Sequence, residues 1–269
     1  MPGLVPGIHV LGAVVGAAKT WMAGTSPTMA AGSCYDLAML ILAIDTALDA
    51  CAAAVLDTEA GALIAQESLP MKRGHAEALM PLIARVMHAA DAPFTALDRI
   101  AVTVGPGSFT GLRVGISAAR GLALAAGKPA VGLTTLSAYA AAIVSRNRPS
   151  PVISAIDARH DHVYVQIVAG DGNPLVRPMV ASVDEAIAAS QFGAPQLVGN
   201  AAKILADRWP ADAPAPIAVD ARPAPDIAWV AWLGAAADPG ATPARPFYLR
   251  APDAKPAAQP PLAVQAATP

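Results

Sequence analysis

The stretch Leu40-Ile41-Leu42-Ala43-Ile44-Asp45 predicts a buried strand that ends in an aspartate, and Ala155-Ile156-Asp157 repeats that ending later in the chain. Four residues after each aspartate comes another, Asp49 in the first half and Asp161 in the second. Apolar runs and turn residues around both places predict one shared order of three strands, a helix, a strand and a helix. The sequence therefore indicates a duplicated α/β unit whose two lobes face each other across a cleft.

Hydrophobic periodicity and turn residues place the individual elements. In the first lobe the predicted strands cover residues 40–45, 50–56, 62–69, 100–104 and 130–133, and the predicted helices cover about 75–90, 110–126 and 135–145. In the second lobe the predicted strands cover 151–157, 163–168, 175–180 and 196–199, and the predicted helices cover about 183–190 and 200–208. The lobes themselves are expected at 39–148 and 149–250, with a polar, proline-ended junction between them.

Both ends of the chain differ in composition from the middle. Glycine and proline recur through residues 1–38 and leave no helix or strand period, so we expect a disordered extension or upstream sequence ahead of a true start at Met39. An export signal is disfavoured because the first charge, Lys19, follows the apolar stretch instead of preceding it. Residues 251–269 are rich in proline and alanine, which predicts a flexible tail.

The overall composition excludes several classes of protein. The 269 residues carry a net charge of −2, which argues against a general electrostatic grip on nucleic acid. Two cysteines, Cys34 and Cys51, cannot build a disulfide framework or a four-cysteine zinc site, so reduced, cytoplasmic chemistry is expected. We also find no stretch of about 20 apolar residues free of glycine, proline and charge, and we therefore expect no membrane span.

The segment Gly105-Pro106-Gly107-Ser108-Phe109-Thr110-Gly111-Leu112-Arg113-Val114-Gly115 joins a predicted strand to a predicted helix. Two interpretations stay open. In one, the helix start and Arg113 bind an anion, with Gly105 and Gly107 allowing close backbone approach. In the other, the segment is a tight turn in which Ser108 or Thr110 caps the helix. Candidate contacts for an anion, a nucleotide or tRNA are the strand-end Asp45 and Asp157 together with Gly105, Gly107, Ser108, Thr110 and Arg113.

Known phosphate and nucleophile patterns do not fit this segment. It lacks the Gly-Lys-Ser/Thr ending of a P-loop, and three residues separate Gly107 from Gly111 where the dinucleotide pattern has two. Pro106 stands where a nucleophile elbow needs glycine, so Ser108 is not supported as a nucleophile.

The predicted helix 110–126 is unusually rich in small residues, among them Gly111, Gly115, Ala118 and Ala119. A glycine inside a helix costs about 1 kcal/mol relative to alanine, which indicates an offsetting close contact. The contact is either with the helix's own sheet or with a second subunit.

Histidines at two places in the sequence are candidate metal ligands. His75 has Leu79 where a His-x-x-x-His pair would place its second ligand, so it is expected to be an ordinary helix-start residue. His160 and His162 lie near Asp157 and Asp161, which suits either a metal cluster or a polar hairpin tip. We expect no metal at either place.

Five segments of the sequence together resemble the TsaB (YeaZ) family. They are residues 40–46, residues 105–115, His75-Ala76-Glu77-Ala78-Leu79-Met80-Pro81-Leu82-Ile83, Asp157-Ala158-Arg159 and Tyr248-Leu249-Arg250. The resemblance covers about residues 39–255. It implies an actin/sugar-kinase/Hsp70-like (ribonuclease H-like) fold of two duplicated α/β lobes. It also implies a non-catalytic, cytoplasmic subunit in synthesis of N6-threonylcarbamoyladenosine in tRNAs that read ANN codons.

The resemblance further implies the partners and their contact surface. A TsaD-type catalytic subunit and a TsaE-type ATPase are expected, with a homodimer as an option and tRNA reached only through the complex. Pairing is expected through helices of the first lobe, with candidate interface residues His75, Leu79, Met80, Ile83, Val86, Met87, Gly111, Gly115, Ala118, Ala119 and Leu122. No cofactor is expected beyond weak nucleotide binding.

One departure from TsaD supports a non-catalytic role. Where TsaD carries two metal-binding histidines, an ungapped comparison places Thr135 and Tyr139, which are poor ligands for a divalent metal. The alternative is a nucleotide-dependent phosphotransferase or hydrolase of the same fold acting alone, with Asp45 and Asp157 near bound phosphate. A third hypothesis is a non-catalytic nucleotide or tRNA contact through Ser108, Thr110 and Arg113.

Overall fold

The computed structural model describes residues 38–144 and 149–250. The first lobe contains β1 (Leu40–Asp45), β2 (Ala50–Asp57), β3 (Ala62–Pro70), α2 (His75–Ala89), η1 (Phe94–Ala96), β4 (Arg99–Gly105), α3 (Phe109–Ala126), β5 (Ala130–Thr134) and α4 (Thr135–Val144). The rest of the chain forms β6 (Val152–Arg159), β7 (His162–Val168), β8 (Pro174–Ser182), α5 (Val183–Ile187), η2 (Ala188–Phe192), β9 (Gln196–Val198), α6 (Ala202–Asp207), β10 (Ala218–Asp220) and α7 (Ile227–Ala236).

The two sheets have the same topology. The first has the strand order β3-β2-β1-β4-β5, and the second has the order β8-β7-β6-β9-β10. In each sheet the first strand in sequence pairs antiparallel with the second and parallel with the fourth. The predicted duplication is therefore confirmed, and the fold is a two-lobed α/β fold of the actin-like type.

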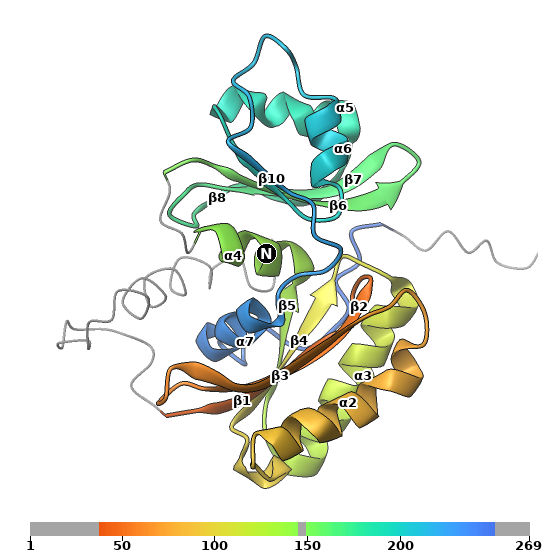
Figure 1. The fold of residues 1–269 in the computed structure, drawn as a ribbon, viewed down its shortest axis with the longest axis vertical. Helices are drawn as coiled ribbons and strands as arrows, with labels where there is room; N and C mark the ends of the chain where they lie inside the picture. The colour runs from red at the N-terminus through yellow and green to blue at the C-terminus, as the bar shows by residue number, and fades with distance from the viewer. Residues whose placement is uncertain (1–37, 145–148, 251–269) are drawn as a thin grey trace, which may run out of the picture.

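The elements stack as alternating layers (Figure 1). Helices α2 and α3 cover the outer face of the first sheet, and α5 and α6 cover the outer face of the second. Helices α4 and α7 lie between the two sheets and contact each other. Because both of its faces are covered, the first sheet has almost completely buried central strands, as β1 and β2 show.

Helix α7 was not predicted from the sequence, although every other α-helix in the described residues was. It follows the second lobe in sequence but packs against β1 and β4 of the first lobe. Gly234 makes this contact close, because a Cβ there would collide with the Cβ of Ala101. Arg99 holds the end of the helix by donating from Nη1 to the carbonyl oxygens of Gly234, Ala235 and Ala237 at 2.8, 2.9 and 2.6 Å.

The segment 242–250, called the strap from here on, leads from this helix along the first sheet. Gly132 donates a backbone hydrogen bond to Thr242, and Phe247 donates one to Val104, at 2.8 Å in both cases. At its end, Arg250 Nη1 donates to the carbonyl oxygen of Ala158 in the second lobe at 3.4 Å. The strap thus connects the edge of the first sheet to the first hairpin of the second lobe.

The predicted strands and helices agree with the structure to within two residues at most boundaries. One difference is the predicted helix 183–190, which is a short α-helix followed by a 3-10 helix. Another is β10, which the sequence did not indicate. The predictions for residues 1–37, for the junction 145–148 and for the tail 251–269 lie outside the described residues.

Candidate functional site

The glycine-rich segment packs tightly against the turn that follows β1. Ser108 donates its backbone N–H to the carbonyl oxygen of Ala47 at 2.7 Å, and the Thr46 hydroxyl donates to the carbonyl oxygen of Gly111 at 2.7 Å. A Cβ on Gly107 would collide with the Ala47 carbonyl oxygen, and one on Gly111 would collide with that of Thr46. The space that these two glycines leave open is therefore filled by the chain's own backbone.

This packing answers part of the question that the sequence left open. The Ser108 hydroxyl accepts a hydrogen bond from Gly111 N at 3.2 Å and is the N-cap of α3, whereas Thr110 lies inside the helix. The tight-turn interpretation therefore describes Gly105, Gly107 and Ser108. Ser108, Thr110 and Arg113 are nonetheless exposed, and an anion contact through them stays a prediction.

Asp45 is fully buried beneath this turn. Its Oδ1 accepts hydrogen bonds from the Thr103 hydroxyl and from Ala47 N, the latter at 3.1 Å, while Oδ2 has no hydrogen-bond partner among the described residues. Burial raises the pKa of Asp45, and the two hydrogen bonds and nearby His75 oppose that rise. In this geometry Asp45 stabilises the turn after β1 by accepting the hydrogen bond from Ala47 N.

His75 and Cys51 lie close to the same turn. His75, at the start of α2, is buried, and its Nε2 lies 3.0 Å from the carbonyl oxygen of Leu48. Burial, followed by the charge of Asp45, raises the pKa of the Cys51 thiol to about 11. Such a thiol is neutral at physiological pH and packs as an apolar group. The turn is thus fixed by β1, α2 and α3 together.

Asp157 lies in a different environment from that of Asp45. It is exposed, and its Oδ1 accepts a hydrogen bond from Arg159 N at 2.7 Å. Asp161 pairs with Arg208 at 2.6 Å, and His162 Nδ1 lies 2.6 Å from the carbonyl oxygen of His160. These contacts are those of a polar hairpin tip. Within residues 38–144 and 149–250 no group of three or more His, Cys, Asp and Glu side chains is arranged to hold a metal ion.

The candidate interface residues divide into buried and exposed positions. Within the first lobe the buried members are His75, Leu79, Ile83, Val86, Met87, Gly111, Gly115 and Ala119. Gly115 faces the Thr46 hydroxyl, so its small size serves the helix's own lobe. Met80 is 47% exposed, and Ala118 and Leu122 are partly exposed. The exposed apolar surface among these candidates is therefore at Met80, Ala118 and Leu122, and Leu124 of α3 is 85% exposed.

Thr135 and Tyr139, the positions compared with the TsaD histidines, both lie in α4, whose residues are all buried. The Tyr139 hydroxyl donates to the carbonyl oxygen of Arg222 at 3.1 Å. Burial raises the pKa of Tyr139 well above its ordinary value, so the phenol stays protonated. Neither side chain is presented as a metal ligand.

A cluster that the sequence did not indicate forms around Arg113. Its guanidinium lies over the Phe109 ring, 3.7 Å from the ring centroid, and Nε donates to the Tyr248 hydroxyl at 3.3 Å. The Phe109 and Tyr248 rings stack with centroids 5.5 Å apart. Tyr248 belongs to the strap, 135 residues from Arg113, so no local pattern in the sequence could have paired them.

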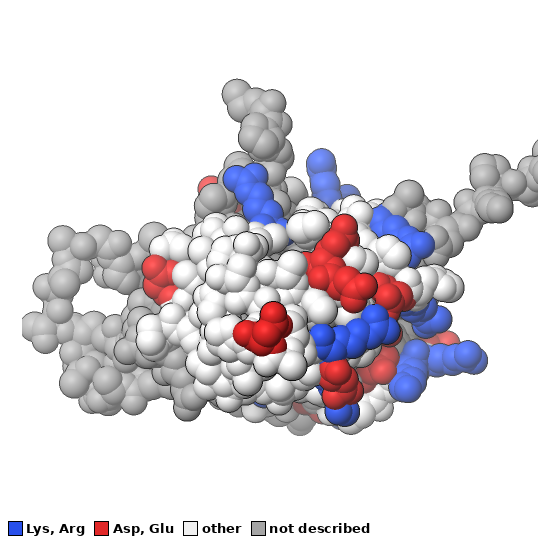
Figure 2. Space-filling model, turned by 90° about the horizontal axis from the view of Figure 1, so that it is seen from above, with Lys and Arg blue, Asp and Glu red and all other residues white. Residues whose placement is uncertain are grey.

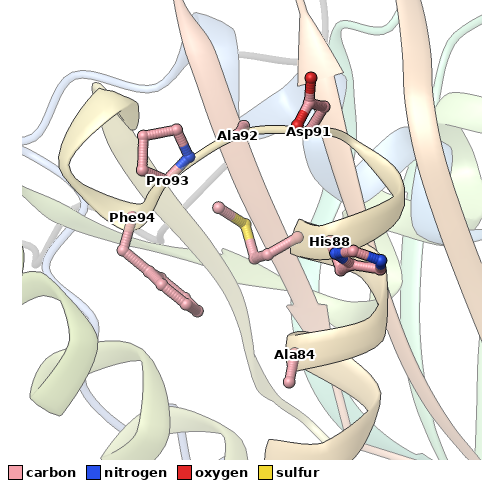
Figure 3. A pocket seen from close by; sticks show the side chains of 7 residues that line it. Ala84, His88, Asp91, Ala92, Pro93 and Phe94 are labelled. Atoms are coloured by element: carbon pink, nitrogen blue, oxygen red, sulfur yellow. The ribbon is translucent and has the colours of Figure 1, made fainter.

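An open hollow of about 440 Å³ lies at the other end of α2 (Figure 3). Its lining consists of Ala84, Met87, His88, Asp91, Ala92, Pro93 and Phe94. His88 lies on one side of it, and Pro93 and Phe94 lie on the other. The hollow contains none of the glycine-segment residues and is therefore separate from the candidate site. In the part of the chain that the structure describes, no helix combines the length and the apolar character needed to cross a membrane.

Comparisons with known proteins agree with this architecture. A family model described as "TsaD: tRNA N6-adenosine threonylcarbamoyltransferase" matches residues 63–219. The "tRNA threonylcarbamoyladenosine biosynthesis protein TsaB" of Escherichia coli (strain K12) is 39% identical over 126 residues, which cover 47% of this chain and 53% of that protein. The match thus spans about half the length of such curated relatives.

Two further relatives match over longer stretches. An uncharacterized protein of Mycobacterium bovis is 33% identical over 223 residues, which cover 81% of this chain and 95% of that protein. Among solved structures, YeaZ from Pseudomonas aeruginosa superimposes with a TM-score of 0.64 at 26% identity, over 78% of this chain and 100% of that chain. The likeness therefore extends to both lobes.

Proposed function

Because this chain belongs to the TsaB/YeaZ family, we propose that it is a non-catalytic subunit in the synthesis of N6-threonylcarbamoyladenosine in tRNA. In this role it binds and supports a TsaD-type catalytic subunit. The observation that carries the proposal is the 39% identity to a protein named for this biosynthesis. That similarity covers 47% of the chain, so the activity, substrate and partners of the whole protein are inferred from a part of it.

The surface of α2 and α3 supports a partner site in the first lobe. Met80 and Leu124 expose 47% and 85% of their surface, and Leu122 adds partly exposed apolar area between small residues. Small residues let a second helix approach closely, and a standard interface buries about 800 Å² on each partner. Two neighbouring helices on the outside of the lobe offer a face of this kind (Figure 1).

The environment of α4 supports the absence of TsaD-type catalysis. A buried threonine and a buried phenol that stays protonated replace the positions of two ligating histidines. Without such ligands this chain would supply no Lewis acid to the transfer step. We accordingly assign the chemistry to the partner, with a TsaE-type ATPase as a third component, tRNA bound through the complex, and the cytoplasm as the location.

The test is to mix the full-length chain with the TsaD-type subunit of the same organism. Size-exclusion chromatography with light scattering should show a stable complex, and the modified nucleoside should form only when both subunits and the remaining components are present. Met80→Glu should weaken the complex by about tenfold or more, because it places a charge in an apolar contact.

A matched control distinguishes the loss of a specific contact at Met80 from a general effect of an added surface charge. Met179 in β8 is 43% exposed and lies in the other lobe, so Met179→Glu should leave the complex unchanged. Equal complex formation by both variants would remove α2 from the contact. Failure of the unmodified chain to bind TsaD at concentrations well above micromolar would contradict the proposed function. Metal-dependent ATP turnover by the isolated chain would instead favour the phosphotransferase or hydrolase alternative.

A further inference from the structure

The cluster around Arg113 holds a cation and two aromatic rings at the surface in a fixed arrangement. Phe109 and Tyr248 are 41% and 42% exposed. The Phe109 ring contacts the face of the Arg113 guanidinium, and the Tyr248 hydroxyl accepts from its Nε, so these two contacts do not use the terminal NH₂ groups as donors. Among the described residues no carboxylate lies within ion-pair distance of Arg113. The cluster therefore presents an ordered, uncompensated hydrogen-bond donor.

A second arginine-bearing segment lies close to this cluster. Tyr248 is two residues from Arg250, which contacts Ala158 in the hairpin between β6 and β7. At the tip of that hairpin Arg159, His160 and Asp161 all have positive φ angles, of 62°, 51° and 61°. Left-handed φ angles are unfavourable for residues other than glycine. Strain of this sort is commonly kept where it serves a function.

The hairpin carries an exposed arginine next to Ala158, the residue that Arg250 contacts. Arg208 pairs with Asp161 at 2.6 Å, and Asp157 accepts a backbone hydrogen bond from Arg159. Arg159 is exposed and has no ion pair among the residues that the structure describes. Arg113 thus contacts both exposed rings, and Arg250 follows Tyr248 by two residues.

We propose that this surface, consisting of Phe109, Arg113 and Tyr248, contacts an unpaired segment of RNA. Aromatic rings offer stacking faces to any base, and arginines bind the phosphates on either side. Two stacked rings beside a guanidinium that has no carboxylate partner among the described residues suit an RNA strand better than an acidic peptide, since a peptide carboxylate needs the arginine alone. The inference rests on the proposed function, since the RNA would be the tRNA that the complex modifies.

Among the described residues, the face at the end of the second lobe has no broad electrostatic surface. Seen from the end of the second lobe, lysines and arginines are interspersed with acidic residues, and a wide area without charged residues lies beside them (Figure 2). Together with the net charge of −2, this leaves no extended basic field on that face. RNA affinity in the complex should therefore depend on a few residues at this surface and on the partner subunit.

The test measures binding of a fluorescein-labelled anticodon stem-loop, from a tRNA that reads ANN codons, to the complex of the full-length chain with its TsaD-type subunit. Arg113→Gln and Tyr248→Ala should each weaken binding roughly tenfold at about 0.1 M salt, by removing a phosphate contact and a stacking face. Arg113→Gln should also reduce the slope of log affinity against log salt concentration by about one. Tyr248→Phe keeps the ring and should keep most of the affinity.

Arg177→Gln is the matched control, because it removes the same charge from β8, at the far edge of the second sheet. It should leave RNA binding unchanged. Unchanged RNA binding by Arg113→Gln and Tyr248→Ala, with intact thermal unfolding, would overturn the inference. If these variants bound TsaD more weakly, and the complex re-formed at higher subunit concentration bound RNA with unchanged affinity, the inference would also be overturned and the surface would be assigned to a protein partner. Absence of any complex with the unmodified chain would instead contradict the proposed function, so the two failures are distinguishable.

Discussion

Individual glycines in α3 differ in which atoms would collide with an added Cβ, and this difference should appear in the free energy of unfolding of alanine variants. A Cβ on Gly115 would collide with the Thr46 hydroxyl, which already donates to Gly111, whereas a Cβ on Gly121 would meet no atom within 4 Å. We expect Gly115→Ala to lower the free energy of unfolding by about 1–3 kcal/mol, because the strain of overpacking exceeds the gain in helix propensity. Urea denaturation monitored by circular dichroism measures this change.

Gly121→Ala is the control within the same helix. It should raise the free energy of unfolding by up to about 1 kcal/mol, since alanine loses less backbone entropy on folding and meets no obstacle here. If Gly115→Ala also proved stabilising, the turn after β1 would have to move away from α3 at little cost. The sequence left open whether Gly115 served a subunit seam or its own lobe. At this residue the structure favours the lobe.

At the scale of elements, predictions succeeded where the hydrophobic pattern was local. The strands of both sheets combine β-branched or apolar runs with clear turn residues, and α2 has buried positions at helical spacing. Helix α7 has no such spacing, because it is apolar on all sides and lies between two sheets. Its flanking prolines and its alanine-rich sequence resemble a linker, so only the tertiary contacts reveal it.

The end of α7 depends on Arg99, which supplies hydrogen bonds to three of its last carbonyl groups. We expect Arg99→Met to lower the free energy of unfolding by about 2–4 kcal/mol, since buried carbonyl groups would lose a charged donor. Chemical denaturation followed by tryptophan fluorescence suits the measurement, because Trp229 and Trp232 lie in this helix. Arg120→Met, at an exposed position of α3, should change the free energy by less than about 0.5 kcal/mol. A similarly small effect at Arg99 would contradict its role as a cap.

At the scale of the whole molecule, the sequence predicted which residues make close contacts better than it predicted which atoms they contact. The spacing of Gly107, Gly111 and Gly115 indicated close approach, but the approaching atoms belong to Thr46 and Ala47, some 65 residues earlier. Anion binding and self-packing therefore could not be separated from the pattern alone. The pairing of Arg113 with Tyr248 lies even further beyond local signals, because it depends on the strap returning to the first lobe.

The strap links distant parts of the molecule, because this one short segment contacts the first sheet, the start of α3 and the second lobe. A chain that stops after Ala241 would lose the hydrogen bonds at Gly132, Val104 and Ala158, whereas a chain that stops after Arg250 would keep them. We expect the shorter chain to lose about 2–4 kcal/mol of unfolding free energy relative to the longer one. Hydrogen exchange adds a local readout, since the Gly132 amide donates to Thr242 and should exchange faster once that acceptor is removed. Equal stability and equal Gly132 exchange in the two chains would mean that the hydrogen bonds of the strap do not stabilise the fold.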